Sequence, residues 1–297
     1  MARSLLAPPT LGGLSLLESG PDDRYFDYCL EPYRPRRPWR GMLRGENIFW
    51  QSLALGGALD SLRPPLLALQ SSLGPDMTVW GVKWDGTRLF WEVYIYDPLK
   101  EEPAATVSSL STTLAPWLRV IPSVSESAPY VMVSFDLDPT IAARGTIDEL
   151  NLYLTGEQGQ AGRVYKVRSG EAELENTYRF LPPKTGIGQI LPLIKASVFV
   201  DFSDPTHLAR ILIPELFACR KICVAKKRRC DAIYFSGVPV DRLLFFLRRF
   251  RYPAPLVEFL AYHQERFEHL LFDMGLDYRQ GQDGAILYPK TSFYGTL

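Results

Sequence analysis

The stretch Met77–Asp97 most constrains how this chain can fold. It reads MTVWGVKWDGTRLFWEVYIYD, which is two alternating runs separated by Asp85-Gly86, a dipeptide that suits a tight hairpin turn. Side chains alternate across a strand, so the second run has two different faces. One face is apolar, and it carries Leu89, Trp91, Val93 and Ile95. The other face is aromatic and polar, and it carries Arg88, Phe90, Glu92, Tyr94 and Tyr96.

Similar strand pairs recur along the chain, with helical segments between most of them. The further predicted pairs are Tyr130–Asp138 with Thr146–Leu154, Gly162–Arg168 with Glu173–Leu181, Lys221–Lys226 with Asp231–Ser236, and Leu276–Arg279 with Ala285–Tyr294. The predicted helices are Asn47–Ser72, Thr106–Leu118, Pro205–Ala218, Val240–Phe250 and Pro255–Met274. We expect Pro64-Pro65 to end or kink the first helix. No helix is evident between the second and third hairpins.

Repeated helix–hairpin units predict an α+β fold in which helices cover one side of an antiparallel sheet. Closure of ten such strands into a barrel would remove unpaired edges and leave room for a ligand. We therefore expect a ten-stranded antiparallel β-barrel surrounded by a ring of α-helices over residues 47–297. Residues 1–46 are rich in proline, and we expect an irregular, solvated lead-in.

Composition excludes several classes of function. The formal net charge is zero, which disfavours nucleic acid as a partner despite the locally basic segment Arg34–Arg40. No apolar run approaches the roughly 20 residues that span a bilayer, and the N-terminus makes a weak signal peptide, so we expect a soluble, cytoplasmic protein. The spacing of Cys219, Cys223 and Cys230 matches no common zinc pattern, and we expect reduced cysteines.

If helices cover the outside of the barrel, the alternate residues of each strand line its interior. In the third pair the inner set is Asn176, Tyr178 and Phe180, or alternatively Thr177 and Arg179. On this reading each outgoing strand contributes a tyrosine to the interior. These tyrosines are Tyr94, Tyr153, Tyr178, Tyr234 and Tyr288. Any one of them could be an ordinary core aromatic, but a ring of five would attract a reactive cation and exclude the water that quenches it.

The five hairpins, the tyrosines on outgoing strands and the closing run Tyr288–Tyr294 resemble the soluble ABBA-type prenyltransferases. Within them the chain is most similar to the bacterial group that includes the aromatic and the cyanobactin peptide prenyltransferases. The resemblance implies transfer of an isoprenyl group from its diphosphate to a peptide side chain or an aromatic small molecule, with the tyrosines shielding the allyl cation. It also implies a monomer in which Glu92 serves as a base or as a magnesium-linked carboxylate, so Mg²⁺ is a possible cofactor.

The resemblance also implies that cations beside the tyrosines hold the diphosphate, often in a Lys-x-Tyr pattern. Here those positions read Asn151-Leu-Tyr153, Asn176-Thr-Tyr178 and Ala232-Ile-Tyr234, without the lysine. The diphosphate-binding residues that we predict are Arg88, Asn151, Asn176, Arg179, Lys290 and Tyr294. Further candidates are Lys83 and the turn cluster Lys226–Arg229. The departure from the pattern leaves a second hypothesis open, namely a non-catalytic barrel that binds a ligand or a peptide.

Overall fold

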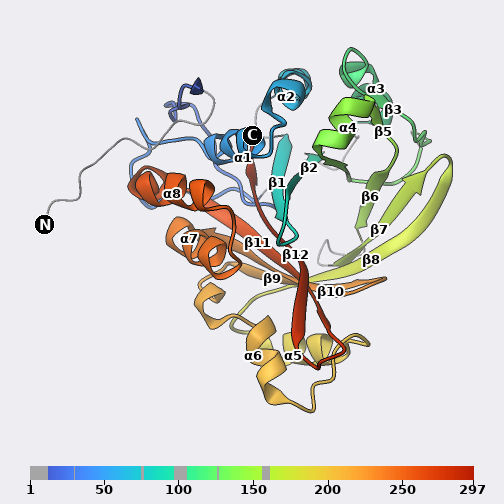
Figure 1. Cartoon of the computed structure of the whole chain (residues 1–297), viewed down its shortest axis with the longest axis vertical. Helices are drawn as coiled ribbons and strands as arrows, with labels where there is room; N and C mark the ends of the chain where they lie inside the picture. Colours follow the sequence, from blue (N-terminus) through green and yellow to red (C-terminus); the bar gives the residue numbers. More distant parts are fainter. Residues whose placement is uncertain (1–12, 30, 75–76, 97–105, 126, 156–160) are drawn as a thin grey trace, which may run out of the picture.

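Ten antiparallel strands close into a barrel (Figure 1). The computed structural model describes residues 13–29, 31–74, 77–96, 106–125, 127–155 and 161–297. In spatial order the barrel strands are β1 (Thr78–Trp84), β12 (Ile286–Thr296), β11 (Leu271–Gln280), β10 (Asp231–Pro239), β9 (Lys221–Lys227), β8 (Glu171–Leu181), β7 (Ala161–Arg168), β6 (Leu150–Thr155), β4 (Met132–Leu137) and β2 (Leu89–Tyr96), which pairs back with β1. The predicted α+β barrel is confirmed. Asp97, the predicted end of the first hairpin, lies outside the described residues.

Eight α-helices are found in the described residues, and they lie on the outside of the barrel (Figure 1). They are α1 (Glu46–Leu55), α2 (Leu59–Leu73), α3 (Val107–Leu114), α4 (Pro139–Arg144), α5 (Ile187–Lys195), α6 (Pro205–Ile211), α7 (Val240–Arg249) and α8 (Ala254–Tyr262). A two-stranded parallel sheet, β3 (Arg119–Val120) with β5 (Thr146–Ile147), flanks α3 and α4. The segment between the second and third hairpins, where no helix was evident from the sequence, includes residues 156–160, which lie outside the described part of the chain.

The first helical segment is interrupted at glycine, and the prediction that it could end at Pro64-Pro65 is wrong. Gly56 and Gly57 separate α1 from α2, and Gly57 has a φ of +69°, which favours glycine. A Cβ at Gly56 would lie 2.4 Å from the Trp91 ring, so the close approach of α1 to β2 requires a glycine there. Pro64 and Pro65 remain inside α2 because the packing of that helix on the core outweighs the backbone hydrogen bonds they remove.

The predicted helix over Pro255–Met274 is also wrong in its second half. Helix α8 ends at Tyr262, a 3₁₀ turn follows at Gln264–Phe267, and β11 begins at Leu271. The early part of the segment has helical spacing, but Phe272 and Met274 alternate with Asp273 and Gly275, and pairing with β10 and β12 selects the strand. Helix α6 is likewise shorter than predicted, and α4 and α5 were not predicted.

The main hydrophobic core lies between the barrel and its helices. It includes Trp80, Trp91, Phe135 and Phe235, which point out of the barrel towards the helices. A second and smaller cluster of Val79, Tyr94, Met132 and Tyr294 lies on the inner face, flanked by partly buried tyrosines. The core outside the barrel therefore supplies the packing, and the inner face is left to aromatic and polar side chains. None of the described helices is long and apolar enough to cross a membrane.

The irregular N-terminal segment lies across one end of the barrel. Residues 25–29 and 31–33, which we call the plug, contact strands β2, β9, β11 and β12 at that end. The four hairpin turns β1–β2, β7–β8, β9–β10 and β11–β12 lie at the opposite end, which we call the turn end. The barrel thus has two distinct ends.

Candidate functional site

Five tyrosines form a continuous arc on the inner face of the barrel. Successive ring centroids are 6.5 Å apart for Tyr178 and Tyr153, 5.9 Å for Tyr153 and Tyr94, 5.8 Å for Tyr94 and Tyr294, and 6.3 Å for Tyr294 and Tyr234. Tyr153, Tyr178 and Tyr234 stay partly exposed although they point inward, so a solvent-sized molecule can reach the inner face. We call this arc the tyrosine layer.

Glycines opposite three of these rings explain how the rings lie against the sheet. Gly81 pairs with Tyr294, Gly162 with Tyr178 and Gly275 with Tyr234 on the neighbouring strand. A Cβ at these glycines would lie 2.6, 2.3 and 2.5 Å, respectively, from the partner ring or its hydroxyl. An aromatic ring that covers a cross-strand glycine lies along the sheet and not across the barrel. The glycines therefore keep space free above the rings.

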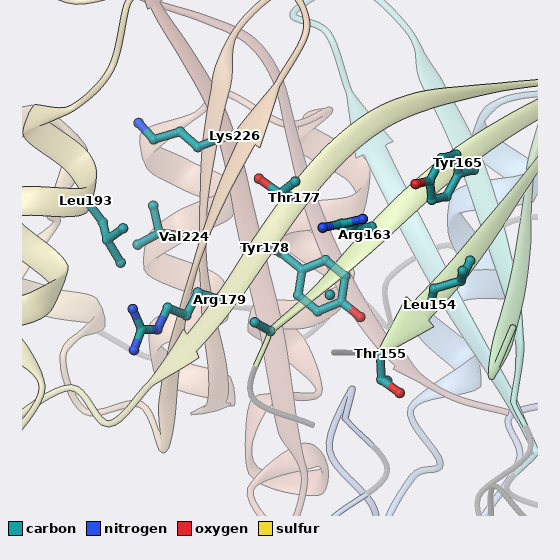
Figure 2. Close-up of a pocket in the computed structure, with 12 residues that line it drawn as sticks. Leu154, Thr155, Arg163, Tyr165, Thr177, Tyr178, Arg179, Leu193, Val224 and Lys226 are labelled. Carbon is teal, nitrogen blue, oxygen red and sulfur yellow. The ribbon is translucent and has the colours of Figure 1, made fainter. Parts of the chain in front are cut away.

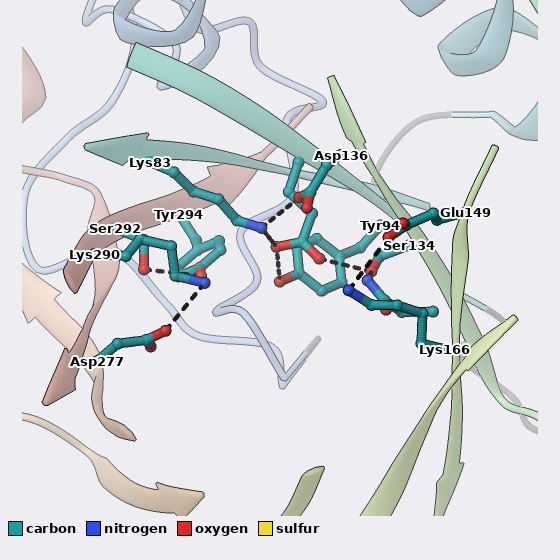
Figure 3. A network of polar contacts seen from close by, with 12 residues as sticks. Lys83, Tyr94, Ser134, Asp136, Glu149, Lys166, Asp277, Lys290, Ser292 and Tyr294 are labelled. Atoms are coloured by element: carbon teal, nitrogen blue, oxygen red, sulfur yellow. Dashed lines mark hydrogen bonds and ion pairs between the residues drawn. The ribbon is translucent and has the colours of Figure 1, made fainter. Parts of the chain in front are cut away.

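A charged layer adjoins the tyrosine layer (Figure 3). Its residues precede the tyrosines on β2 and β12, which places the layer nearer the turn end. The Lys83 ammonium lies 2.5 Å from Glu92 Oε2 and 2.5 Å from Asp136 Oδ1. Tyr94 donates its hydroxyl to Glu92 Oε2 at 2.6 Å, and Ser134 donates to Glu92 Oε1 at 2.7 Å. Both oxygens of the Glu92 carboxylate are thus engaged, and its side chain is only 5% exposed.

A second ionic group in the charged layer joins β9, β11 and β12. Asp277 lies 2.7 Å from the Lys227 ammonium and 3.4 Å from the Lys290 ammonium. Lys227 also lies 5.7 Å from the centroid of the Tyr234 ring, a distance at which a cation is attracted to the π face. On β12, Tyr294 donates to Ser292 Oγ at 2.9 Å (Figure 3). The charged layer therefore contacts the tyrosine layer at several points.

The charges in this layer shift one another's pKa values. Burial alone would raise the pKa of Glu92, but Lys83 and Lys290 outweigh it and lower that pKa to about 2. The pKa of Asp277 is also lowered to about 2, by Lys227 and Lys290 against the effect of burial. The pKa of Lys290 is lowered, because burial and the neighbouring Lys227 and Lys83 outweigh Asp277. The pKa values of Lys83 and Lys227 are raised, so of these three lysines Lys290 is the one whose positive charge is least stabilised by its carboxylate neighbours. An added anion would stabilise that charge.

The structure brings together only some of the predicted site residues. Glu92, Tyr94, Tyr153, Tyr178, Tyr234, Lys290 and Tyr294 all face the interior. Asn151 faces it as well and donates to Ser134 Oγ at 3.2 Å, which links it to Glu92. Asn176 lies on the same face of β8 as Tyr178, opposite Val164.

Tyr288 does not lie in the interior, so its predicted place among the inner tyrosines is wrong. Its hydroxyl donates to the carbonyl of Arg210, and its ring packs on Phe250 next to α7. The pairing of β11 with β12 shifts register between Asp277 and Arg279, and this shift breaks the alternation that would have turned Tyr288 inward. The fifth tyrosine of the layer is Tyr294.

Two predicted diphosphate ligands also point elsewhere. Arg88 pairs with Asp85 in the first hairpin turn, and its side chain is 65% exposed. Arg179 lies on the outer face of β8, in a groove of about 580 Å³ that Arg163, Lys226 and Leu193 also line. Figure 2 shows Arg179 extending towards Leu193 of α5 and the Tyr178 ring extending to the other side. The ambiguity of the third hairpin is thereby resolved, with Tyr178 inside and Arg179 outside.

Several inner residues were missed or ranked low from the sequence. Lys83 and Lys227 were only secondary candidates, because they lie on incoming strands and not beside a tyrosine in the Lys-x-Tyr spacing. Asp277 lies within the predicted strand Leu276–Arg279, but it was missed because inner residues were sought only on the outgoing strands. Tyr28 was missed because it belongs to an irregular segment, and it packs on Tyr294 with 4.9 Å between the ring centroids.

The described residues do not fit a metal ion held by the protein alone. No group of three or more His, Cys, Asp or Glu side chains that could hold a metal is present in the described part of the chain. The Glu92 oxygens are occupied by Lys83, Tyr94 and Ser134, and each Asp277 oxygen faces a lysine. The magnesium role that the sequence suggested for Glu92 therefore finds no support in its contacts.

Solved structures share the fold of this chain, and one of them is a prenyltransferase. The crystal structure of the NotF prenyltransferase superposes with a TM-score of 0.51 at 11% sequence identity, and the match covers 83% of this chain and 91% of that chain. No protein-family model matches the sequence, and no curated protein matches it either. At this identity the likeness establishes a shared fold, the helix-surrounded antiparallel barrel of a prenyltransferase.

Proposed function

We propose that this protein is a prenyltransferase that moves an isoprenyl group from an isoprenyl diphosphate to a peptide side chain or an aromatic small molecule. The observation that carries the proposal is the tyrosine layer, which adjoins a layer of lysines inside a closed barrel. A diphosphate ester needs cations at one end of a site and a dry, electron-rich surface at the other. The fold shared with a prenyltransferase supports the same reading.

In this proposal the diphosphate binds at the charged layer. Lys290 and Lys227 would be its main ligands, because both ammonium groups lie beside Asp277 on the inner face. The lowered pKa of Lys290 shows that its positive charge would gain from a bound anion. Lys83 would contribute from β1. Asn151 and Asn176 would add hydrogen bonds without charge. The bond between the isoprenyl carbon and oxygen breaks with its electron pair leaving on the diphosphate, where the lysines stabilise the new charge.

The allyl cation that remains would lie against the tyrosine layer. The faces of Tyr94, Tyr153 and Tyr294 would stabilise it, and a bound donor that fills the space above these rings would displace water from them. Glu92 hydrogen-bonds to Tyr94, so its negative charge adds to the same attraction. A pKa of about 2 makes Glu92 a weak proton acceptor. We therefore assign it to stabilisation of the cation, and the proton released by the acceptor would pass to the departing diphosphate.

A product assay tests this proposal. The protein is incubated with dimethylallyl, geranyl and farnesyl diphosphates and a panel of phenols, indoles and aromatic peptides, and products are detected by mass spectrometry. We expect one prenylated product class, lost in Tyr153→Ala and reduced in Lys290→Gln. Lys184→Gln, which changes an exposed lysine away from the barrel interior, is the matched control. If no donor and acceptor pair gives product, the catalytic proposal is wrong.

A non-catalytic binding barrel is the second candidate function. It is favoured by the pairing of four inner lysines with carboxylates, because an incoming anion would have to compete with those carboxylates. The four lysines are Lys83, Lys166, Lys227 and Lys290. This candidate predicts calorimetric binding of a hydrophobic ligand or peptide without turnover. Equal binding of an isoprenyl alcohol and its diphosphate would favour it over the enzyme.

A further inference from the structure

Tyr28 closes the tyrosine layer at the plug end of the barrel. Its ring centroid lies 5.3 Å from that of Tyr94, edge to face, and 4.9 Å from that of Tyr294. The side chain is partly exposed although it points among inner residues, so it faces the same interior space. A residue from outside the ten barrel strands thus completes the inner wall.

The backbone on both sides of Tyr28 is held in place by the barrel. The Tyr28 amide donates to Asp273 Oδ2 at 2.9 Å, and the Tyr96 hydroxyl donates to the Tyr28 carbonyl at 2.8 Å. None of these bonds involves the Tyr28 phenol. The side chain can therefore be changed while its backbone anchors remain.

Contacts from neighbouring plug residues add to this rigidity. Asp27 pairs with Arg220 at 3.1 Å and accepts the amides of Cys29 and Glu31 at 3.0 and 3.1 Å. Glu31 forms an ion pair with Lys221 at the start of β9. The plug is thus tied to β2, β9 and β11, and Tyr28 has a defined position.

The order of residues along the strands sets a direction inside the barrel. On β12, Lys290 is followed by Ser292 and Tyr294 on the inner face, and Tyr28 lies beyond Tyr294. Four residues of strand span about 13 Å. A ligand whose anionic group binds at Lys290 would therefore extend its hydrocarbon chain along the tyrosine layer and end at Tyr28.

We propose that Tyr28 is a specificity-determining residue that limits the length of the isoprenyl chain the barrel accepts. This inference rests on the proposed function, because it needs a diphosphate bound at the charged layer. The ring and hydroxyl of Tyr28 contain more heavy atoms than one isoprene unit, so their removal makes room for a longer chain at the far end. The full-length tyrosine favours the five-carbon donor over the ten-carbon donor.

The test compares donors in variants of Tyr28. We expect Tyr28→Ala to raise the ratio of kcat/KM for geranyl over dimethylallyl diphosphate at least about tenfold, the size of effect that one filled apolar subsite produces. Tyr28→Phe keeps the ring and should leave the ratio unchanged. Tyr25→Ala is the matched control, because Tyr25 belongs to the same plug but packs on Trp39 and His269. Tyr28→Leu serves as a second shortened variant if Tyr28→Ala does not fold.

The outcomes separate this inference from the proposed function. A folded Tyr28→Ala or Tyr28→Leu with an unchanged donor ratio overturns the role of Tyr28 while leaving the enzyme proposal intact. A general loss of activity with every donor, without a change in ratio, would show a purely structural role and also overturns it. If the unaltered protein binds no isoprenyl diphosphate by calorimetry, both proposals fail.

Discussion

Replacement of Glu92 by glutamine tests the buried ion pair at the centre of the charged layer. The change keeps the size of the side chain but removes the charge that faces the Lys83 ammonium at 2.5 Å and accepts from Tyr94 and Ser134. Removal of one partner from a buried pair costs about 3–5 kcal/mol. Lys83 keeps Asp136 as a second partner, so we expect the lower end, about 3 kcal/mol.

Asp136→Asn is the matched comparison for this prediction. It removes the other carboxylate on the same lysine, but the Asp136 side chain is 51% exposed, and exposed pairs are worth less than about 1 kcal/mol. Urea unfolding followed by circular dichroism gives both changes in the free energy of unfolding. In the double variant Lys83→Met with Glu92→Gln, the cost should be smaller than the sum of the single costs. Equal costs for Glu92→Gln and Asp136→Asn would refute the reasoning that burial makes the Glu92 pair dominant.

Three further predictions concern pH, packing and the outward tyrosine. The folded pKa values of Glu92 and Asp277 lie near 2, below their ordinary values of 4.5 and 3.8. The stability that these two carboxylates contribute is therefore present above about pH 4.5 and is lost as the pH falls towards 2. When urea midpoints are measured between pH 2 and 6, the midpoint of Asp277→Asn should fall less steeply with decreasing pH than that of the unaltered protein. Gly81→Ala places a Cβ 2.6 Å from the Tyr294 ring. We expect this variant to lower the free energy of unfolding in urea by about 1–3 kcal/mol and to lower turnover. An unchanged urea midpoint would contradict the close packing of Tyr294 on Gly81. Tyr288→Phe removes only a hydrogen bond to a carbonyl outside the barrel, so kcat and KM should not change and stability should fall by about 1 kcal/mol; a loss of turnover would contradict its outward placement.

The architecture could be predicted because its signals are local. The first hairpin is identified by the alternation of apolar and polar residues in Leu89–Tyr96 and by the Asp85-Gly86 turn before it. Signals of this kind are read within one hairpin and need no knowledge of its neighbours. The outward face of Trp91 and the inward face of Tyr94 follow from the same alternation. Closure into a barrel then follows from the number of hairpins and the need to cover strand edges.

The positions of the site residues depend on features that alternation does not reveal. Tyr288 was placed inside because a register shift between β11 and β12 is invisible in the sequence. Cations were expected two residues before each tyrosine, whereas Lys83 and Lys227 reach the site from neighbouring strands and Lys290 lies four residues before Tyr294. Tyr28 could not be predicted because no periodicity marks a residue in an irregular segment.

Binding of an unreactive donor analogue tests the central claim most directly. Dimethylallyl thiolodiphosphate is titrated calorimetrically into the protein, into Lys290→Gln and into Lys184→Gln. We predict one site per chain, with affinity reduced at least about tenfold in Lys290→Gln, because a buried charged contact to the diphosphate is lost, and unchanged in Lys184→Gln. No binding, or equal binding to Lys290→Gln and the unaltered protein, would contradict a diphosphate site at the charged layer.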